Sequence, residues 1–378
     1  MSVERNNIIF VSGTTYPNGL ASTNRIKGLL RELTRNSWFA TVYCLSATRY
    51  PTGNKGGSPQ FKREGNDEGV GYYYLPFSVR EPKYRVLRIV NNGVGLFFLP
   101  FILISREKKS KFGRSILATN ITSIFHVLYF KVISLIINHK LVLIRSEFPN
   151  IVQHRPRVKY FLYRTLFEKW YFKLFNGYVL MTRTLKEYFS VYARKDSKLE
   201  IIPMTVDLNR FNSFQESPFP FDYIAYAGSL SSKKDGLDIL LKAFIKLAHK
   251  NPKINLAIAG DKNDSSAYSY LLGIVNNEAE QIKGRIHFVG RIDSNDIPSF
   301  LKNAKALALA RPKSRQAEGG FPTKLGEYLA TGKPVIVTNV GEITDYLQHK
   351  KNAILCSSDD VDSFADGLEW VINNYPEA

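Results

Sequence analysis

One loop in the second half of the sequence combines residue types that suit it to binding an anion and a diol. Gly319 and Gly320 follow an apolar stretch, and glycine lets backbone approach a ligand closely. Thr323 is a natural N-cap for the next helix, whose first N–H groups can bind an anion. Lys324 adds a cation in the first turn. Glu327 lies one turn after Thr323 on the same helix face, where its carboxylate could accept two hydrogen bonds from a ribose diol.

These side chains need a rigid scaffold, and the chain predicts one in which short apolar strands alternate with helices. Strands are predicted at Ile8–Ser12, Thr41–Leu45, Ile116–Thr119, Leu141–Arg145, Gly177–Thr182, Leu199–Pro203, Tyr223–Ala227, Asn255–Gly260, Ile286–Val289, Ala306–Ala310, Pro334–Thr338 and Ala353–Cys356. Helices are predicted at Thr23–Leu33, Gly236–His249, Asn295–Asn303 and from Thr323 onward. This alternation is typical of parallel sheets with helices on both faces.

The fold class predicted is α/β, with two doubly wound, Rossmann-like domains that face a central cleft. The domains are placed at residues 1–208 and 209–378, with Asn209–Pro220 as the linker because it holds two prolines and shows little periodicity. Ligands bind such sheets at the carboxyl ends of the strands, where the strand order reverses.

Composition excludes several classes of protein. The 378 residues are 44% hydrophobic and 13% aromatic, which excludes disorder, and two distant cysteines exclude a disulfide scaffold and suit a reducing compartment. The net charge of +19 invites a nucleic-acid partner. However, residues 1–195 hold 31 Lys+Arg and 10 Asp+Glu, whereas residues 196–378 hold 21 and 23. The two halves are therefore expected to face different partners.

The longest purely apolar run, Val94–Ile104, has eleven residues, and no secretory signal is read at the N-terminus. A spanning helix needs about 20 residues, so the run is not expected to cross a bilayer. Its basic flanks are Arg80, Lys83, Arg85 and Arg88 before it and Arg106, Lys108, Lys109, Lys111 and Arg114 after it. This pattern favours contact with an anionic membrane surface. The alternative is a buried helix followed by a solvated charge run.

The segment Phe321–Val337 resembles the donor-site motif of glycosyltransferase family 4, the retaining sugar transferases of the GT-B fold. It has the Gly-Phe loop, a glutamate on the next helix and a Gly-x-Pro-Val strand. Four further matches occur in the order that the family requires: Ser12–Ser22, Ile201–Phe211, Tyr226–Leu230 with the lysines after it, and His287–Ile292. The resemblance covers most of residues 199–358 and, less closely, the first 45.

The resemblance implies transfer of a sugar from a nucleotide-diphosphate sugar to an acceptor hydroxyl with retention, without a metal or another cofactor. It assigns Lys234, Glu318 and Gly19 to the reaction and Ser229, Lys233, Gly290, Ile292, Gly320, Phe321, Thr323, Lys324 and Glu327 to the donor. Two positions depart from the family. Gly319 stands where the family has its first glutamate, so either Glu318 or backbone groups at Gly319–Phe321 orient the sugar. Ser229 stands where an arginine is common.

The expected partners are a nucleotide-diphosphate sugar, a saccharide or lipid-linked acceptor and an anionic membrane surface, with no nucleic acid. The expected location is the cytoplasm, peripheral on the inner face of the plasma membrane, in bacterial polysaccharide, lipopolysaccharide or glycolipid synthesis. Glu147, His154 and the aromatic–basic stretch 159–175 remain open as acceptor contacts or as structural residues. The alternatives are an epimerase or an inverting transferase of the same fold, a nucleic-acid-binding protein and an inactive scaffold.

Overall fold

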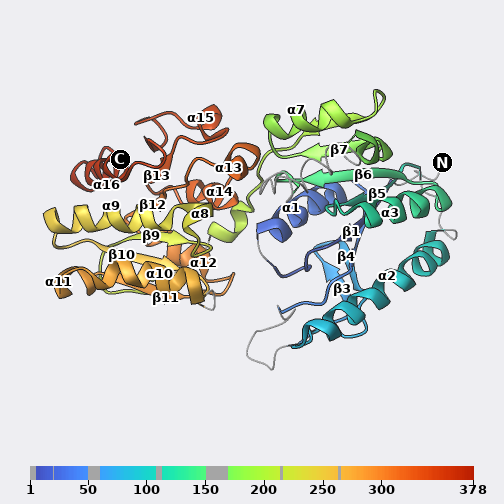
Figure 1. The fold of residues 1–378 in the computed structure, drawn as a ribbon, viewed down its shortest axis with the longest axis horizontal. Coiled ribbons are helices and arrows are strands. Elements are labelled where there is room, and N and C mark those ends of the chain that lie inside the picture. Colours follow the sequence, from blue (N-terminus) through green and yellow to red (C-terminus); the bar gives the residue numbers. More distant parts are fainter. Residues whose placement is uncertain are drawn as a thin grey trace. The chain divides into compact units, whose positions relative to one another are not determined.

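The computed structural model describes residues 6–19, 21–49, 60–107, 113–149, 169–212, 216–262 and 265–378. The chain divides into two compact units, Met1–Thr205 and Val206–Ala378, three residues before the boundary that the sequence suggested (Figure 1). The predicted linker packs on the C-terminal unit, because Phe211 of the short helix η3 (Leu208–Phe211) is buried in its core and Phe219 packs against that core.

The N-terminal unit is built on an eight-stranded sheet in the order β3-β4-β2-β1-β5-β6-β7-β8. Its strands are β1 (Asn7–Ser12), β2 (Phe39–Cys44), β3 (Glu64–Asp67), β4 (Val70–Tyr74), β5 (Ser115–Thr119), β6 (Lys140–Arg145), β7 (Gly177–Leu180) and β8 (Lys198–Ile201). Every pair is parallel except β3 with β4. The strand order reverses between β1 and β5.

The hairpin β3–β4 was not predicted from the sequence. Strand β3 reads Glu-Gly-Asn-Asp and has no apolar residue to reveal it. Its turn is made by Glu68 and Gly69, both with positive φ (51° and 91°), the conformation that favours tight hairpins. The strand therefore depends on pairing with β4 rather than on burial of its own side chains.

The helices of the N-terminal unit are α1 (Ala21–Arg35), α2 (Arg85–Glu107), α3 (Ile124–Ile136), α6 (Lys169–Tyr171), η2 (Phe172–Leu174) and α7 (Arg183–Tyr192). Helix α2 is twice as long as the apolar run within it, because the helix continues N-terminally through Asn91 and Asn92. By length and composition it could span a membrane, although one such helix is weak evidence of a span. The length argument made from the eleven-residue run is therefore wrong.

The C-terminal unit contains a six-stranded, fully parallel sheet in the order β11-β10-β9-β12-β13-β14. Its strands are β9 (Tyr223–Ala227), β10 (Asn255–Ala259), β11 (Ile286–Gly290), β12 (Ala306–Leu309), β13 (Val335–Thr338) and β14 (Ile354–Cys356). All six agree with the sequence prediction to within one residue at either end. The order reverses between β9 and β12, which places the binding edge at their carboxyl ends.

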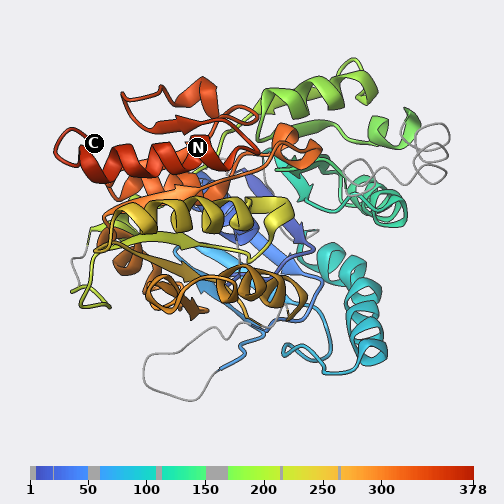
Figure 2. The same ribbon diagram turned by 60° about the vertical axis from the view of Figure 1, so that its left-hand side comes forward.

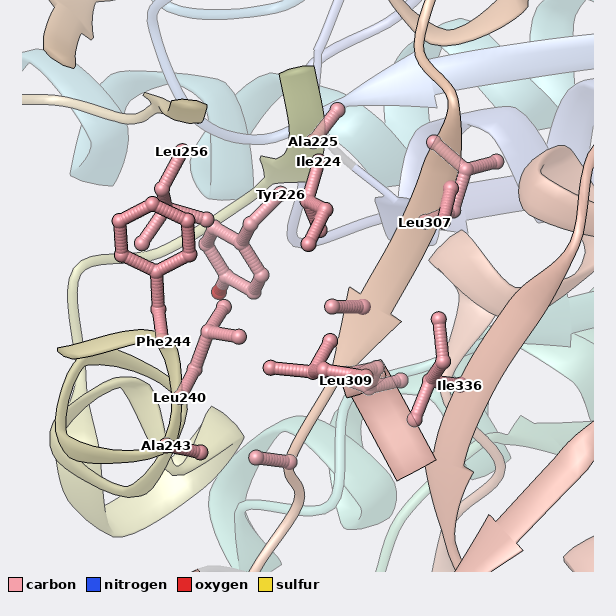
Figure 3. Close-up of a cluster of buried hydrophobic side chains, with 14 of the residues drawn as sticks. Ile224, Ala225, Tyr226, Leu240, Ala243, Phe244, Leu256, Leu307, Leu309 and Ile336 are labelled. Carbon is pink, nitrogen blue, oxygen red and sulfur yellow. The ribbon is translucent and has the colours of Figure 1, made fainter. Parts of the chain in front are cut away.

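The helices of this unit are α8 (Ser232–Asp235), α9 (Leu237–Lys250), α10 (Ser265–Asn276), α11 (Glu280–Lys283), α12 (Ile297–Lys302), α13 (Arg315–Gly319), α14 (Thr323–Ala330), α15 (Ile343–Tyr346) and α16 (Val361–Asn373). Helix α9 buries Leu240 and Phe244 against Tyr226 and Leu309 of the sheet (Figure 3). Helix α16 packs beside α9 (Figures 1 and 2). The two cysteines, Cys44 and Cys356, are buried and not disulfide-bonded.

Candidate active site

The loops that follow β9 and β12 are locked together at the carboxyl edge of the C-terminal sheet. Gly236 links α8 to α9 with a positive φ of 66°. A Cβ atom at this position would lie 1.8 Å from the carbonyl oxygen of Ala310, directly after β12. Only glycine allows this contact, so the junction of α8 and α9 lies directly against the end of β12.

A buried ion pair beneath the loop that follows β9 helps to hold the same surface. Lys324 Nζ lies 2.8 Å from Asp235 Oδ2 and 2.9 Å from the hydroxyl of Tyr226, which is itself 3.0 Å from Asp235. The side chains of Lys324 and Asp235 are only 15% and 4% exposed. Tyr226 also lies 2.6 Å from the carbonyl oxygen of Ser229, so the cluster holds the loop that follows β9.

Electrostatics in this cluster follow from burial and from the ion pair. Burial lowers the pKa of the Lys324 ammonium, and the carboxylate of Asp235 opposes that effect. Burial opposes ionisation of Asp235 as well, but the charge and hydrogen bond of Lys324 hold the pKa of the carboxyl below its usual range. A buried charge with a well-placed partner is costly to separate, so Lys324, which the sequence suggested as a cation for the ligand, is instead paired inside the protein.

Two of the exposed cations at this edge, Lys233 and Lys234, lie on α8. Ser231 caps that helix by accepting a hydrogen bond from the backbone N–H of Lys234 at 3.2 Å. Ser229, which replaces the arginine common in the family, is exposed in the same loop. The structure therefore brings Ser229, Lys233 and Lys234 to one surface, with Lys324 behind them.

Glu327 lies on α14 and forms an ion pair that the sequence analysis did not find. Its Oε1 is 2.6 Å from Nη1 of Arg210 in η3. The other terminal nitrogen of Arg210 donates to the carbonyl oxygen of Ser294 at 2.8 Å. Arg210 thus connects the predicted ribose carboxylate to the loop after β11.

That loop begins at Gly290, which has a positive φ of 79°. The backbone N–H of Gly260, at the end of β10, donates to the carbonyl oxygen of Gly290 at 2.9 Å. A Cβ on Gly260 would lie 2.7 Å from the carbonyl oxygen of Gly228. The ends of β9, β10 and β11 are therefore close neighbours, and Ile292 follows directly in the partly buried part of the same loop.

The loop after β12 contains the short helix α13, whose N-cap Ser314 accepts from the N–H of Ala317. Gly320 ends α13, and the ring of Phe321 packs edge-on against Tyr346 at 5.2 Å. Pro322 occupies the N-cap position of α14, so Thr323 is its first helical residue. The prediction of Thr323 as N-cap is wrong by one residue, because Thr323 is already helical and the extended residue before the helix is Pro322.

Glu318 lines a polar pocket of about 370 Å³ on the β13 and β14 side of the same edge. The pocket is lined by Lys313, Ser314, Ala317, Glu318, Asn339, Val340, Gly341, Ser357 and Ser358. Glu318 also forms a 3.3 Å ion pair with Arg315, one turn earlier in α13. The lining of this pocket includes Glu318 but not Lys324, Asp235 or Tyr226.

In the N-terminal unit, Gly19 lies in the loop between β1 and α1. A Cβ there would lie 2.2 Å from Thr23 Oγ1 and 2.8 Å from Thr15 Oγ1, so close packing requires glycine. Thr23 donates to the carbonyl oxygen of Thr15 at 2.8 Å, and Gly13 N–H donates to Asn120 Oδ1 at 3.1 Å. The predicted reaction loop is thus held in one conformation and bonded to the residue after β5.

Arg145, at the end of β6, extends this network by donating to the carbonyl oxygens of Asn120 and Glu147. The backbone carbonyl of Glu147 therefore takes part in a structural hydrogen bond. His154 lies outside the described residues, as does most of the stretch 159–175. Among the residues that the structure describes, no group of three His, Cys, Asp or Glu side chains could hold a metal ion.

The fold matches solved structures along nearly the whole chain. A sucrose-phosphate synthase from Thermosynechococcus elongatus superposes with a TM-score of 0.69 at 14% identity, over 99% of this chain and 91% of that one. HepE from Anabaena, solved in complex with UDP and glucose, superposes with a TM-score of 0.64 at 14% identity, over 98% and 91%. These similarities confirm the two-sheet α/β architecture expected for the GT-B fold.

Sequence comparison relates the C-terminal unit to a known family. Residues 210–378, a little less than half of the chain, match the family described as glycosyl transferases group 1. A protein from Haemophilus influenzae named as an uncharacterized glycosyltransferase is 30% identical over 152 residues, 40% of this chain and 39% of that protein. YqgM of Bacillus subtilis, similarly named, is 24% identical over 220 residues, 57% and 56%. The alignments thus span less than two thirds of these relatives.

Proposed function

We propose that the chain transfers a sugar from a nucleotide-diphosphate sugar to an acceptor hydroxyl with retention, as a glycosyltransferase of the family 4 type. The observation that supports this most is the edge at β9 and β12, where two exposed lysines, a ribose-type carboxylate and two glycine-bearing loops occur within the family-matched unit. The HepE structures with UDP and with UDP-glucose support a nucleotide-sugar donor for this fold.

In this mechanism the developing negative charge is on the departing diphosphate. Lys234, with Lys233 beside it, is proposed to stabilise that charge as the sugar–phosphate bond breaks. A separate carboxylate nucleophile of the kind that retaining glycosidases use is not part of the proposal. Instead, the leaving phosphate takes the proton of the acceptor hydroxyl on the same face of the sugar, and the anomeric configuration is retained.

The pocket that contains Glu318 is proposed to receive the hydroxyl groups of the transferred sugar. A carboxylate accepts hydrogen bonds from vicinal hydroxyls, and the lining also supplies hydroxyl, amide and ammonium groups suited to a sugar, next to Ala317, Val340 and Gly341. If backbone groups at Gly319–Phe321 orient the sugar instead, Glu318→Gln will leave the donor KM and kcat unchanged. A rise in donor KM with unchanged affinity for the free nucleotide supports Glu318.

The acceptor is proposed to be lipid-linked, in bacterial polysaccharide, lipopolysaccharide or glycolipid synthesis at the cytoplasmic face of the plasma membrane. The support is the charge of the N-terminal half, which holds three cations for each acid, while the donor half is nearly neutral. An anionic, membrane-borne acceptor would meet the basic half, and a negatively charged nucleotide sugar would need only local lysines.

The experiment that tests this proposal incubates the protein with UDP-, GDP-, ADP- and dTDP-linked sugars and lipid or saccharide acceptors. Release of nucleotide that depends on the acceptor, and a product with the donor's anomeric configuration by NMR, are expected. An inverted product would identify an inverting transferase. Conversion of the donor without any acceptor would identify an epimerase or a hydrolase of the same fold.

A further inference from the structure

Helix α2 presents an apolar face to solvent. Val86, Val90, Phe97 and Phe101 recur at helical spacing and are 70%, 60%, 65% and 61% exposed. In a surface helix of a soluble protein this face carries polar side chains, and the apolar stripe faces the core. Here both faces of one helix are apolar, which implies that the outer face has a partner of its own.

Helix α3 repeats the pattern. Phe125, Leu128, Val132, Leu135 and Ile136, at positions i, i+3, i+7, i+10 and i+11, are all exposed, and Phe125 is 81% exposed. The opposite face of the helix is buried through Val127, Phe130 and Ile133. The two helices therefore share the same unusual feature.

A specific bond joins the two helices. Pro100 lies inside α2 and lacks the N–H that would bond to the carbonyl oxygen of Leu96, one turn earlier. The hydroxyl of Tyr129 on α3 donates to that carbonyl. Figures 1 and 2 both show α2 and α3 along one side of the N-terminal unit. Their exposed side chains are called the α2–α3 face below.

The inner side of α2 fixes the helix to the unit. Asn91 accepts from the N–H of Ser78 at 2.6 Å and donates to its carbonyl oxygen at 3.0 Å. Leu99 and Leu103 are fully buried, and a Cβ on Gly95 would lie 3.0 Å from that of Leu75. Crossing a bilayer would break all these contacts, so α2 is better suited to lie along a surface.

Cations lie at both ends of α2. Arg85 and Arg88 line a pocket of about 320 Å³ beside the first turns of the helix, together with Ser46, Asn92 and Glu81, whose carboxylate pairs with Arg88 at 2.7 Å. At the other end, the guanidinium of Arg106 lies 5.1 Å from the ring centre of Tyr73. Apolar side chains between arginines suit a surface that carries both hydrocarbon and phosphate.

We propose that the α2–α3 face docks on an anionic phospholipid bilayer, with both helices in the plane of the interface and the arginines at the phosphates. A second copy of the chain is a poorer occupant. In a two-fold dimer the face would meet itself, and the arginines at its edges would approach like charges. The proposal extends the function above by naming the membrane-binding surface, but binding to vesicles does not depend on sugar transfer.

The test is flotation of the full chain with vesicles, without donor or acceptor. Vesicles of phosphatidylcholine with 30% phosphatidylglycerol are compared with phosphatidylcholine alone, using the double variants Phe97→Ser/Phe101→Ser and Phe125→Ser/Leu128→Ser. Each double variant should bind anionic vesicles at least about tenfold more weakly, since each removes two large apolar groups from the interface. Val191→Ser on α7, 75% exposed in the same unit, is the matched control.

Arg85→Gln should weaken binding to anionic vesicles and leave the weaker binding to phosphatidylcholine unchanged. Near-ultraviolet circular dichroism checks that each variant is folded. Wild-type binding in both double variants would overturn the proposal, as would equal loss in Val191→Ser. Two other results contradict it: a dimer that the double variants abolish, and extraction resistance to alkaline carbonate, which indicates a span. If vesicle binding fails these tests, the proposed sugar transfer is not affected, because its assay does not depend on vesicles.

Discussion

Lys234 carries the chemical part of the proposal at the scale of single residues. Lys234→Ala should lower kcat by about 10²-fold or more, the effect of removing one stabilising donor from a developing anion. Its side chain is exposed, so the free energy of unfolding should change by less than about 0.5 kcal/mol. Lys242→Ala, exposed on α9, is the matched control. Equal kcat values in the two variants would contradict the proposed role of Lys234 in the reaction.

Glu327 can be tested through the group that it is proposed to bind. Calorimetry with a ribonucleoside diphosphate and its 2′-deoxy analogue should show a wild-type preference for the ribose, because a diol offers two donors to one carboxylate. Glu327→Ala should lose that preference. If the variant keeps the same preference, the carboxylate serves only to hold Arg210, with which it pairs at 2.6 Å.

The ion pair between Asp235 and Lys324 is expected to stabilise the folded protein. Asp235→Ala should lower the free energy of unfolding by about 3 kcal/mol, because it leaves a buried ammonium without its partner. Glu369→Gln, which breaks the more exposed pair with Lys250, should lower the free energy of unfolding far less, because solvent screens that pair. Urea titration measures both variants, and equal costs would contradict the role given to burial.

The sign of the pH dependence follows from the pKa of Asp235, which is lower in the folded protein than in the unfolded chain. The stability from this group is complete above its unfolded pKa, near 4, and is lost as the pH falls through the folded value. Asp235→Asn should therefore flatten the acid side of the stability profile below about pH 4 without shifting its alkaline side.

Residue-level prediction from sequence worked where a side chain's environment is set by its near neighbours. The surface position of Lys234 and the shared face of Thr323 and Glu327 follow from one loop and one helix. The partners of Lys324 and Glu327 do not, because Asp235 and Arg210 lie 89 and 117 residues away in the chain. Arg210 carried no signal of its own, and only the folded sheet places it there.

At the scale of elements, Gly236 decides whether the β9 and β12 loops fit together. Gly236→Ala should lower the free energy of unfolding by more than about 2 kcal/mol, because φ is 66° and the new Cβ would lie 1.8 Å from a backbone oxygen. Gly273→Ala on α10 is the opposite control. A Cβ atom added at this position would have no atom within 4 Å, so the substitution should stabilise the helix by up to about 1 kcal/mol.

Except for β3 and β4, the strands of both sheets were predictable, because most of them are short, buried apolar runs between turn residues. The elements that sequence missed or misjudged are those whose stability comes from a neighbour. Strand β3 depends on pairing with β4, and α2 continues through Asn91 because Ser78 satisfies that side chain. Neither contact is visible in local composition.

At the scale of the whole molecule, part of the excess of basic residues in the N-terminal half lies beside the exposed apolar faces of two helices. The sequence suggested a membrane contact at one apolar run, whereas the structure offers two helices with outward apolar faces and arginines at the ends of α2. The near-neutral C-terminal unit matches the group 1 family and carries the proposed donor site. The two charge regimes thus correspond to two proposed partners, a lipid surface and a nucleotide sugar.

The most direct test of the central claim is calorimetric titration of the wild-type chain with UDP-, GDP-, ADP- and dTDP-linked sugars, with Lys234→Ala beside it. We expect saturable binding of at least one of these donors and weaker binding in the variant, because the exposed lysine is proposed to contact the diphosphate. No binding of any of the four donors, or binding that is identical in Lys234→Ala, would contradict the account.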